Sequence, residues 1–368
     1  MNIIHRLVRP DVSKISPYGP GKSANEVKRE LGLDRVLKLA SNENPLGPSP
    51  KAMSAIFEMS ADVHTYPDAK GFDLKNKLAA KYGLSPHEVI LGNGSEELLM
   101  LLGQVFINAG DKVVMGRPTF PIYSISTLLM GGVPVEVPVT NLGSLDLEAM
   151  LNNITPGTKM VFLCNPNNPT GGMVTKQEVR EFMDRISPDV LVVADEAYAE
   201  YVDDPDYGDF LPYVKEGRNV IVLHTFSKIY GLAGLRVGYG LATQDICALI
   251  ERVKPCFNQN VFAQVAAVAA LDDHDHVRKS LKNNHAGKRY LTSELTAIGC
   301  KVYPSWGNFL LVDTGIDCQV LFEQMLKRGV IVRPATPWEL PTCLRITIGT
   351  PDENGVLIDE MKLAMAGV

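Results

Sequence analysis

The chain has 368 residues, of which 45% are hydrophobic and 21% charged, and its formal net charge is −6 at pH 7. These values are typical of a globular protein with a large apolar core, and the length suggests two domains. They exclude a disordered chain or a solenoid. The mildly acidic balance also gives little electrostatic reason to bind nucleic acid or an anionic membrane.

Six cysteines are too few for a disulfide framework, and none of them forms a CxxC pair. The first twenty residues lack the apolar segment of a secretion signal, and no run of 18 apolar residues could span a membrane. We therefore expect a cytoplasmic protein. The run Asp272–His276 is better explained as a solvated loop between helices than as a metal site, and we expect no bound metal.

The first fifty residues are rich in Pro and Gly, which predicts an extended arm with one short helix over residues 25–31. A helical pattern then runs from Leu74 to Lys81, and short apolar runs alternate with helical segments after it. Such alternation predicts an α/β domain with a mainly parallel sheet.

The pattern changes in the last third of the chain. After Asp245 three helices are expected, over residues 245–253, 261–271 and 276–297. Short strands and two further helices follow, which predicts a smaller α+β domain; the strands are expected near residues 302, 309–312, 330–332 and 344–348, and the helices over 318–328 and 352–365. We therefore divide the chain into an N-terminal arm that packs with the small domain (1–45), a large domain (46–275) and a small domain (276–368).

Five apolar runs in the large domain carry no charge, as expected of strands buried on both faces. A segment rich in Gly, Pro or polar residues follows each of them. Because the carboxyl ends of parallel strands lie along one edge of a sheet, we expect these segments to converge on one cleft. The runs are Val89–Leu91, Val113–Met115, Met160–Cys164, Val190–Ala194 and Val220–Leu223.

Lys228 follows the last of these runs, in a Gly-rich segment. Partial desolvation there favours the neutral, nucleophilic amine that forms Schiff bases. Ser227 and Arg236 offer a hydroxyl and a guanidinium suited to a phosphate monoester. The alternative is a surface lysine in a flexible loop.

Asp195 stands where an uninterrupted apolar strand stops, and a carboxylate there needs a cation such as a protonated pyridine nitrogen. Tyr198 could reach the phenolic oxygen of the same ring. Alternatively, the acidic pair at this strand end only caps a helix.

Gly94-Ser95-Glu96 opens a strongly apolar helix at another strand end, so that free backbone amides point into the cleft and could hold a phosphate. The alternative is an ordinary Ser N-cap. Phe120 offers a flat face for a ring, or belongs to the core.

Jointly these features resemble the fold-type I pyridoxal 5'-phosphate enzymes, specifically the aminotransferase branch that includes the histidinol-phosphate aminotransferases. The resemblance covers nearly the whole chain. It is most specific in Pro17-Tyr18 with Pro20-Gly21-Lys22, Lys38–Gly47, Tyr66-Pro67-Asp68, Asn165–Gly171, Ala194–Tyr198, Ser227–Arg236, Val332-Arg333-Pro334 and Leu344–Thr350.

The resemblance implies that Lys228 forms a Schiff base with pyridoxal 5'-phosphate and that Asp195 holds the pyridine nitrogen protonated. Asn168 and Tyr198 would bind the ring oxygen, and Phe120 would stack on the ring. The cofactor phosphate would be held by the backbone amides of Gly94, Ser95 and Glu96 and by the side chains of Ser227 and Arg236.

The resemblance also implies a homodimer, in which Tyr66 reaches the cofactor phosphate of the neighbouring subunit. Arg345 would bind an anionic group of the substrate, with Arg333, Asn44 and Tyr18 beside it.

The activity implied is transfer of the amino group of L-histidinol phosphate to 2-oxoglutarate, giving imidazole acetol phosphate and glutamate in histidine biosynthesis. An aromatic-amino-acid aminotransferase and a phosphothreonine-type decarboxylase remain alternatives on the same scaffold. A non-catalytic regulator is a weaker one, because no basic helix-turn-helix segment is present to serve it.

Overall fold

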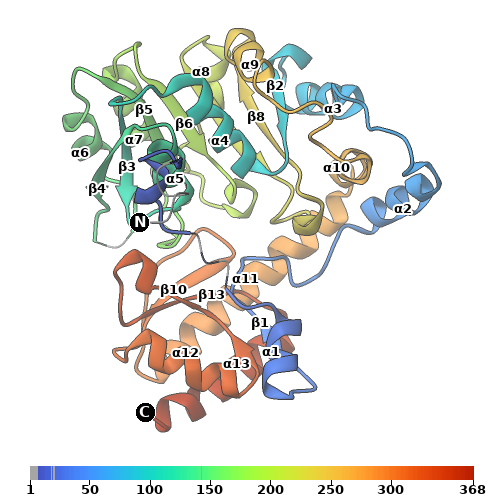
Figure 1. Cartoon of the computed structure of the whole chain (residues 1–368). Helices are drawn as coiled ribbons and strands as arrows, with labels where there is room; N and C mark the ends of the chain where they lie inside the picture. Colours follow the sequence, from blue (N-terminus) through green and yellow to red (C-terminus); the bar gives the residue numbers. More distant parts are fainter. Residues whose placement is uncertain (1–6, 18, 20, 142) are drawn as a thin grey trace.

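The computed structural model describes residues 7–17, 19, 21–141 and 143–368 (Figure 1). Its largest sheet has seven strands in the order β2-β8-β7-β6-β5-β3-β4. These strands are β2 (Val89–Gly92), β3 (Lys112–Arg117), β4 (Val133–Pro138), β5 (Thr158–Cys164), β6 (Leu191–Asp195), β7 (Val220–Thr225) and β8 (Gly238–Ala242). All pairs from β7 to β4 are parallel, which confirms the predicted α/β class with a mainly parallel sheet.

Strand β8 is antiparallel to both of its neighbours, β2 and β7. Strand β2 therefore runs in the same direction as β7, and the carboxyl ends of all five predicted strands lie at one edge of the sheet. Two strands were not predicted, for physical reasons. Strand β8 contains Gly238 and Gly240, where a Cβ would meet neighbouring atoms, and the edge strand β4 contains Pro134 and Pro138.

Side chains of successive strand residues pack into different cores. In β5, Val161 and Leu163 belong to one apolar cluster, whereas Met160 and Phe162 belong to the other. This burial on both faces explains why the strands are continuous apolar runs. The first cluster is completed by α2 (Pro50–Met59), α3 (Phe72–Tyr82), α6 (Leu147–Asn152), α7 (Lys176–Arg185), α8 (Leu211–Lys215) and α10 (Val261–Leu271), and the second by α4 (Ser95–Phe106), α5 (Ile122–Leu129) and α9 (Gln244–Glu251).

The C-terminal part of the chain has a sheet of its own, in the order β12-β13-β10-β9 (Figure 1). Its elements are β9 (Lys301–Val302), β10 (Phe309–Asp313), β12 (Arg333–Pro334), β13 (Cys343–Thr347), α11 (His274–Ala297), α12 (Cys318–Lys327) and α13 (Pro351–Ala366). One apolar cluster joins residues of these helices to β10 and β13. The short 3-10 helices are η2 (Val12–Lys14), η3 (Ser60–Asp62), η4 (Pro86–Glu88), η5 (Ala199–Tyr201), η6 (Ala233–Leu235) and η7 (Thr336–Trp338).

The N-terminal arm contacts both parts of the molecule. Strand β1 (Leu37–Lys38) pairs in parallel with β11 (Val330–Ile331), and Val27 of α1 (Ala24–Leu31) shares an apolar cluster with Ala40 and Ile331. Arg9, in contrast, donates to the carbonyl of Leu129 at the end of α5. We keep the division at residues 45 and 275 as a proposal, which the pairing of β1 with β11 supports.

The Asp272–His276 run connects α10 to α11 as predicted, but it is only partly solvated. Helix α11 begins at His274, and Asp273 is its N-cap, accepting from the His276 amide at 3.2 Å. Asp273 also accepts from the Ser49 hydroxyl at 2.6 Å, and both Asp273 and His276 are buried. Asp273 is therefore a buried helix cap that bonds to the residue before α2, whereas Asp272, His274 and Asp275 are exposed. None of the helices in the described part of the chain has the length and hydropathy needed to cross a membrane.

Candidate active site

A pocket of about 280 Å3 lies at the carboxyl edge of the large sheet, where the C-terminal part of the chain faces it. Segments that follow β2, β3, β5, β6 and β7 contribute to its walls, as do β12, β13 and residues 40–43. The predicted convergence is therefore present in the structure. The predicted site residues that line the pocket are Ser95, Glu96, Phe120, Asn168, Asp195, Tyr198, Ser227, Lys228, Arg236, Arg333 and Arg345.

Lys228 points its amine into this pocket from the turn after β7. The Nζ donates to the carbonyl of Ser41 at 3.3 Å and lies 5.6 Å from the centre of the Tyr198 ring. Burial lowers the pKa of Lys228 to about 8, and the positive charges of Arg345 and Arg236 act in the same direction. A large fraction of the amine is therefore neutral near pH 8, as a nucleophile or base requires.

Asp195 is buried at the end of β6. Its Oδ2 accepts from the Tyr123 hydroxyl at 2.8 Å, and its Oδ1 accepts from the Ala197 amide at 3.3 Å. Burial raises the pKa of Asp195 to about 6, although these two hydrogen bonds and the charge of Lys228 lower it. A cation placed against this carboxylate would favour its ionised form.

Tyr123 is a site residue that the sequence analysis missed. Its ring stacks on Phe162 with the centroids 4.8 Å apart, and it meets Phe120 edge-on. Burial raises the pKa of Tyr123 well above its usual range, so the hydroxyl stays a hydrogen-bond donor. The residue lies in an apolar helix and was indistinguishable from core. The hydroxyl of Tyr123 was the feature that could have identified it, because a buried tyrosine usually needs a polar partner.

An anion cradle lies at the start of α4. Gly94 is the N-cap with φ of 81°, and no side chain of the described residues caps this helix. Ser95 is the first helical residue, so the alternative of a Ser N-cap is wrong. A Cβ on Gly94 would collide with the Arg236 guanidinium, which lies directly against it. Amides at a helix start and an arginine therefore face the same space, as an anion requires.

Hydroxyl groups complete the cradle. The Ser227 Oγ accepts from Arg236 Nη1 at 3.4 Å and from the Thr225 Oγ1 at 2.9 Å. Thr225 also lines the pocket and was not predicted. Its position at the end of β7, two residues before Ser227, was the signal that could have identified it.

Arg345 and Arg333 lie opposite each other on the paired strands β13 and β12, and both are buried. Arg345 donates from Nη1 to Asn168 Oδ1 at 2.7 Å and from Nη2 to the carbonyl of Ala40 at 2.6 Å. The structure thus joins Asn168, predicted for the cofactor, to Arg345, predicted for the substrate. Two guanidinium groups on one wall favour a substrate that carries an anionic group.

Tyr198 is held by a further residue that the sequence analysis missed. The Asn42 Nδ2 donates to the Tyr198 hydroxyl at 3.0 Å, and the Asn42 Oδ1 accepts from Thr347 Oγ1 at 3.1 Å. Burial raises the pKa of Tyr198 well above its usual range. Asn42 lies within a quoted segment of the resemblance, but nothing in its immediate neighbours distinguished it from Asn44.

The structure does not bring Asn44 to the pocket. Its Nδ2 donates to the carbonyl of Ile229 at 2.7 Å and to the Ser280 hydroxyl at 2.8 Å, and its Oδ1 accepts from the Leu46 amide. These bonds use the amide to tie the arm to α11, so we withdraw the predicted substrate contact. Tyr18 lies outside the described residues.

Tyr66 also lies away from the pocket in this chain. Its side chain is 80% exposed and stacks on Phe257 at 4.6 Å, beside a surface pocket of about 530 Å3. Apart from the Phe257 stack, most of this side chain stays uncovered by the described residues.

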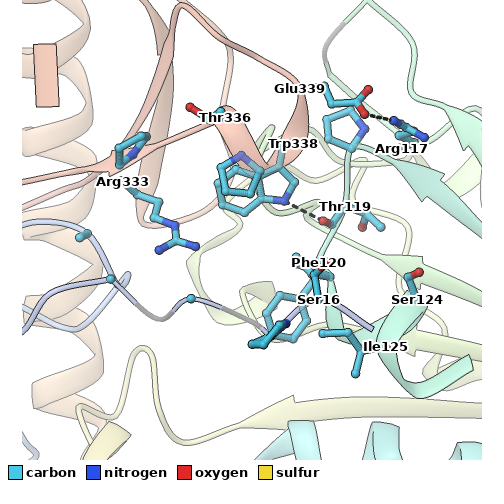
Figure 2. Close-up of a pocket in the computed structure, with 18 of the residues that line it drawn as sticks. Ser16, Arg117, Thr119, Phe120, Ser124, Ile125, Arg333, Thr336, Trp338 and Glu339 are labelled. Carbon is cyan, nitrogen blue, oxygen red and sulfur yellow. Dashed lines mark hydrogen bonds and ion pairs between the residues drawn. The ribbon is translucent and has the colours of Figure 1, made fainter. Parts of the chain in front are cut away.

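A larger pocket of about 830 Å3 adjoins the first one and shares Ala40, Phe120 and Arg333 with it. The N-terminal arm, the 116–128 segment and the 331–339 segment form its walls. Figure 2 shows Trp338 between Arg333 and the 117–120 segment in this pocket. It gives a bound molecule room to extend past Phe120.

Comparison with known proteins agrees with this geometry. The family model for aminotransferases of class I and II matches residues 34–361. The chain belongs to this aminotransferase family. It is 48% identical over 359 residues to the histidinol-phosphate aminotransferase of Moorella thermoacetica, covering 97% of this chain and 93% of that protein. It is 44% identical over 356 residues to that of Caldicellulosiruptor saccharolyticus, covering 97% and 99%.

Solved structures give the same assignment. The histidinol-phosphate aminotransferase of Sinorhizobium meliloti, in complex with pyridoxal 5'-phosphate, superimposes with a TM-score of 0.90 at 27% identity and covers 98% of both chains. The predicted family, fold and enzyme class are therefore confirmed.

Proposed function

We propose that this aminotransferase uses pyridoxal 5'-phosphate to move the amino group of L-histidinol phosphate to 2-oxoglutarate. The observation that carries the proposal is one pocket in which the Lys228 amine, the Asp195 carboxylate, an anion cradle and two arginines meet. Relatives named histidinol-phosphate aminotransferases, 41–48% identical over nearly their whole length, support the choice of donor. We also propose a cytoplasmic location, in keeping with that biosynthetic role.

The residues present fit this cofactor. Its phosphate suits the start of α4 with Arg236, where no described side chain caps the helix. Its pyridine nitrogen, when protonated, would be a cation beside the buried Asp195 carboxylate and would stabilise the ionised form of that carboxylate. Its aldehyde suits the Lys228 amine, whose pKa is already lowered to about 8. When bound, the cofactor supplies an electron-withdrawing ring that lets a C–H bond of the amino donor ionise.

The protein's own residues position the reactants and move the proton. Lys228 would hold the cofactor aldehyde through its Nζ, and the same amine, once free, would be the base that moves the substrate proton. Phe120 would pack against the cofactor ring, and Tyr198 and Asn168 would hold its ring oxygen; all three line the pocket.

The two arginines would bind the anion of each substrate in turn. Histidinol phosphate brings a phosphate and no α-carboxylate, whereas glutamate brings carboxylates only. A guanidinium can bind either group with two parallel hydrogen bonds, which an ammonium cannot do. The imidazole ring would extend past Phe120 toward the larger pocket.

We also propose a homodimer in which Tyr66 reaches the cofactor phosphate of the partner subunit. Val63 lines the surface pocket beside Tyr66 and is 59% exposed, and Phe57 and Phe72, within ten positions of Tyr66 in the sequence, are 71% and 68% exposed. Large apolar side chains that stay exposed are typical of a surface that is covered by another protein.

The function is tested by a panel of amino donors with 2-oxoglutarate. We expect glutamate to form with histidinol phosphate at a kcat/KM at least about 100-fold above that with phenylalanine, since two arginines match a phosphate dianion. Phosphothreonine should release no carbon dioxide. A preference for phenylalanine would make the chain an aromatic aminotransferase, and carbon dioxide from phosphothreonine would make it a decarboxylase.

Replacing Tyr123 with phenylalanine tests the support of Asp195. The ring stack on Phe162 is kept, but the donor to Oδ2 is lost, and the pKa of Asp195 should rise further. A hydrogen bond to a charged group contributes about 1.5–3 kcal/mol, so single-turnover rates should fall roughly 10- to 100-fold.

Tyr82→Phe is the matched control for Tyr123→Phe. Its hydroxyl lies 2.6 Å from the Tyr239 hydroxyl in a partly buried bond, so this variant also loses a tyrosine hydroxyl bond, but one to another tyrosine instead of to Asp195. Equal rate losses in the two variants would show that Tyr123 acts only through stability.

A further inference from the structure

The turn formed by residues 336–339, which we call the 336–339 turn, contacts the end of β3 and the segment between β3 and α5. The Trp338 Nε1 donates to the carbonyl of Thr119 at 2.9 Å, and the Glu339 carboxylate forms an ion pair with the Arg117 guanidinium. Figure 2 shows both contacts as dashed lines. The turn belongs to the C-terminal part of the chain and the segment to the large sheet, so these contacts bridge the two parts.

The ring of Trp338 contacts both arginines of the site. The guanidinium carbons of Arg333 and Arg345 lie 5.8 Å and 5.5 Å from the ring, and Trp338 is only 6% exposed. A cation within about 6 Å of an indole is attracted to the negative charge of the ring face. Arg333 and Arg345 lie on adjacent strands, and their positive charges repel each other. The attraction of both guanidinium groups to the Trp338 ring offsets part of this repulsion.

The geometry of the turn indicates a docked conformation. Glu339 has φ of 61° and is the left-handed C-cap that ends η7. The Trp338 bond, with the exposed ion pair to Arg117 beside it, joins this turn to the large sheet. On the other side of the dock, Thr119 directly precedes Phe120, which lines both pockets.

We propose that Trp338 is a positioning residue that holds Arg333 and Arg345 at a fixed distance from the segment carrying Phe120. It thereby sets the affinity of the site for the anionic group of both substrates. The inference rests on the proposed function, in which these arginines bind the substrate anions. Trp338 would act through the arginines and would leave the chemistry at Lys228 unchanged.

The test compares two variants of the holoenzyme. Trp338→Phe keeps an aromatic ring and loses the N–H donor, whereas Trp338→Met keeps a large apolar side chain without a π face. The dissociation constant for inorganic phosphate is measured by calorimetry, and KM and kcat are measured for both substrates.

We expect Trp338→Met to weaken phosphate binding and raise both KM values roughly tenfold, with kcat within about twofold, because the loss falls on anion binding. Trp338→Phe keeps a ring face against the arginines but loses the bond to Thr119, so its effects should lie between those of the wild type and of Trp338→Met. The visible absorption of the bound cofactor should be unchanged in both. If Trp338→Met does not fold, Trp338→Leu is measured in its place.

Trp306 provides the control. It is the other tryptophan of the chain, and its Nε1 donates to Asp204 at 3.2 Å, but it lines neither pocket. Trp306→Met should leave phosphate binding unchanged. The proposal is overturned if Trp338→Met binds phosphate like the wild type, if Trp338→Phe is equally impaired, or if the wild type binds no phosphate. Phosphate binding does not depend on which amino donor is used, so its outcome is separate from that of the donor panel.

Discussion

Lys228→Ala is expected to lose measurable turnover while still binding pyridoxal 5'-phosphate. The variant lacks both the covalent attachment and the base that moves the proton, and each contributes orders of magnitude to the rate. The phosphate cradle at the start of α4 with Arg236 and Ser227 is untouched, so non-covalent binding should persist. Single-turnover mixing with histidinol phosphate measures the loss, and equilibrium dialysis measures the retained cofactor.

Borohydride reduction of the wild type and peptide mapping should place the pyridoxyl group on Lys228. The chain offers a demanding control in Lys288, whose pKa is also lowered to about 8 by burial. Its Nζ donates to the carbonyl of Ser305 at 2.7 Å, and Lys288 lines neither pocket. Label on Lys288, or full activity in Lys228→Ala, would remove Lys228 from its role. Label on Lys228 alone would show that position in the pocket, beyond amine basicity, selects the residue.

Much of the site could be predicted because strands buried on both faces are visible as uninterrupted apolar runs. Because Asp195 and Lys228 follow the carboxyl ends of two such runs, the sequence alone predicts that they lie at one edge of the sheet. Strands β4 and β8 were missed because Pro and Gly interrupt the apolar signal. Both strands do lie in the sheet: β4 at its edge, and β8 where glycine admits close neighbours.

The supporting residues were harder to predict because their roles depend on contacts between distant segments. Tyr123 lies 72 positions from Asp195, and Asn42 lies 156 positions from Tyr198. Asn44 shows the opposite error: it is two residues from Asn42, but its amide is used by Ile229 and Ser280. The sequence indicated that asparagines in this segment could serve the site. Only the packing of the folded chain shows which of the two does so.

Asp195→Asn is expected to slow the half-reaction with histidinol phosphate about a thousandfold. The amide keeps the shape of the carboxylate but cannot hold a proton on the pyridine nitrogen, and breaking a buried charge pair costs about 3–5 kcal/mol. Stopped-flow measurement of the half-reaction checks this expectation. Near-normal rates would mean that another group holds the ring nitrogen.

Asp195→Asn should also increase the free energy of unfolding of the apoenzyme, because the pKa of Asp195 is raised in the folded chain. Burial raises the pKa of Asp195 from 3.8 to about 6 in the folded chain. As pH rises from 4 to 6, the unfolded chain ionises first, so this carboxylate lowers the free energy of unfolding, by about 3 kcal/mol once pH exceeds 6. Asparagine is uncharged, so it does not lower the free energy of unfolding in this way.

Denaturant unfolding of both apoenzymes should therefore give Asp195→Asn the larger free energy of unfolding at pH 8, and the difference should vanish near pH 4. In the holoenzyme the advantage should shrink at pH 8, because the wild-type carboxylate gains its cation there. An apoenzyme that Asp195→Asn destabilises at pH 8 would mean that the ionised carboxylate is already compensated within the protein, and the argument for a cofactor cation at Asp195 would fail.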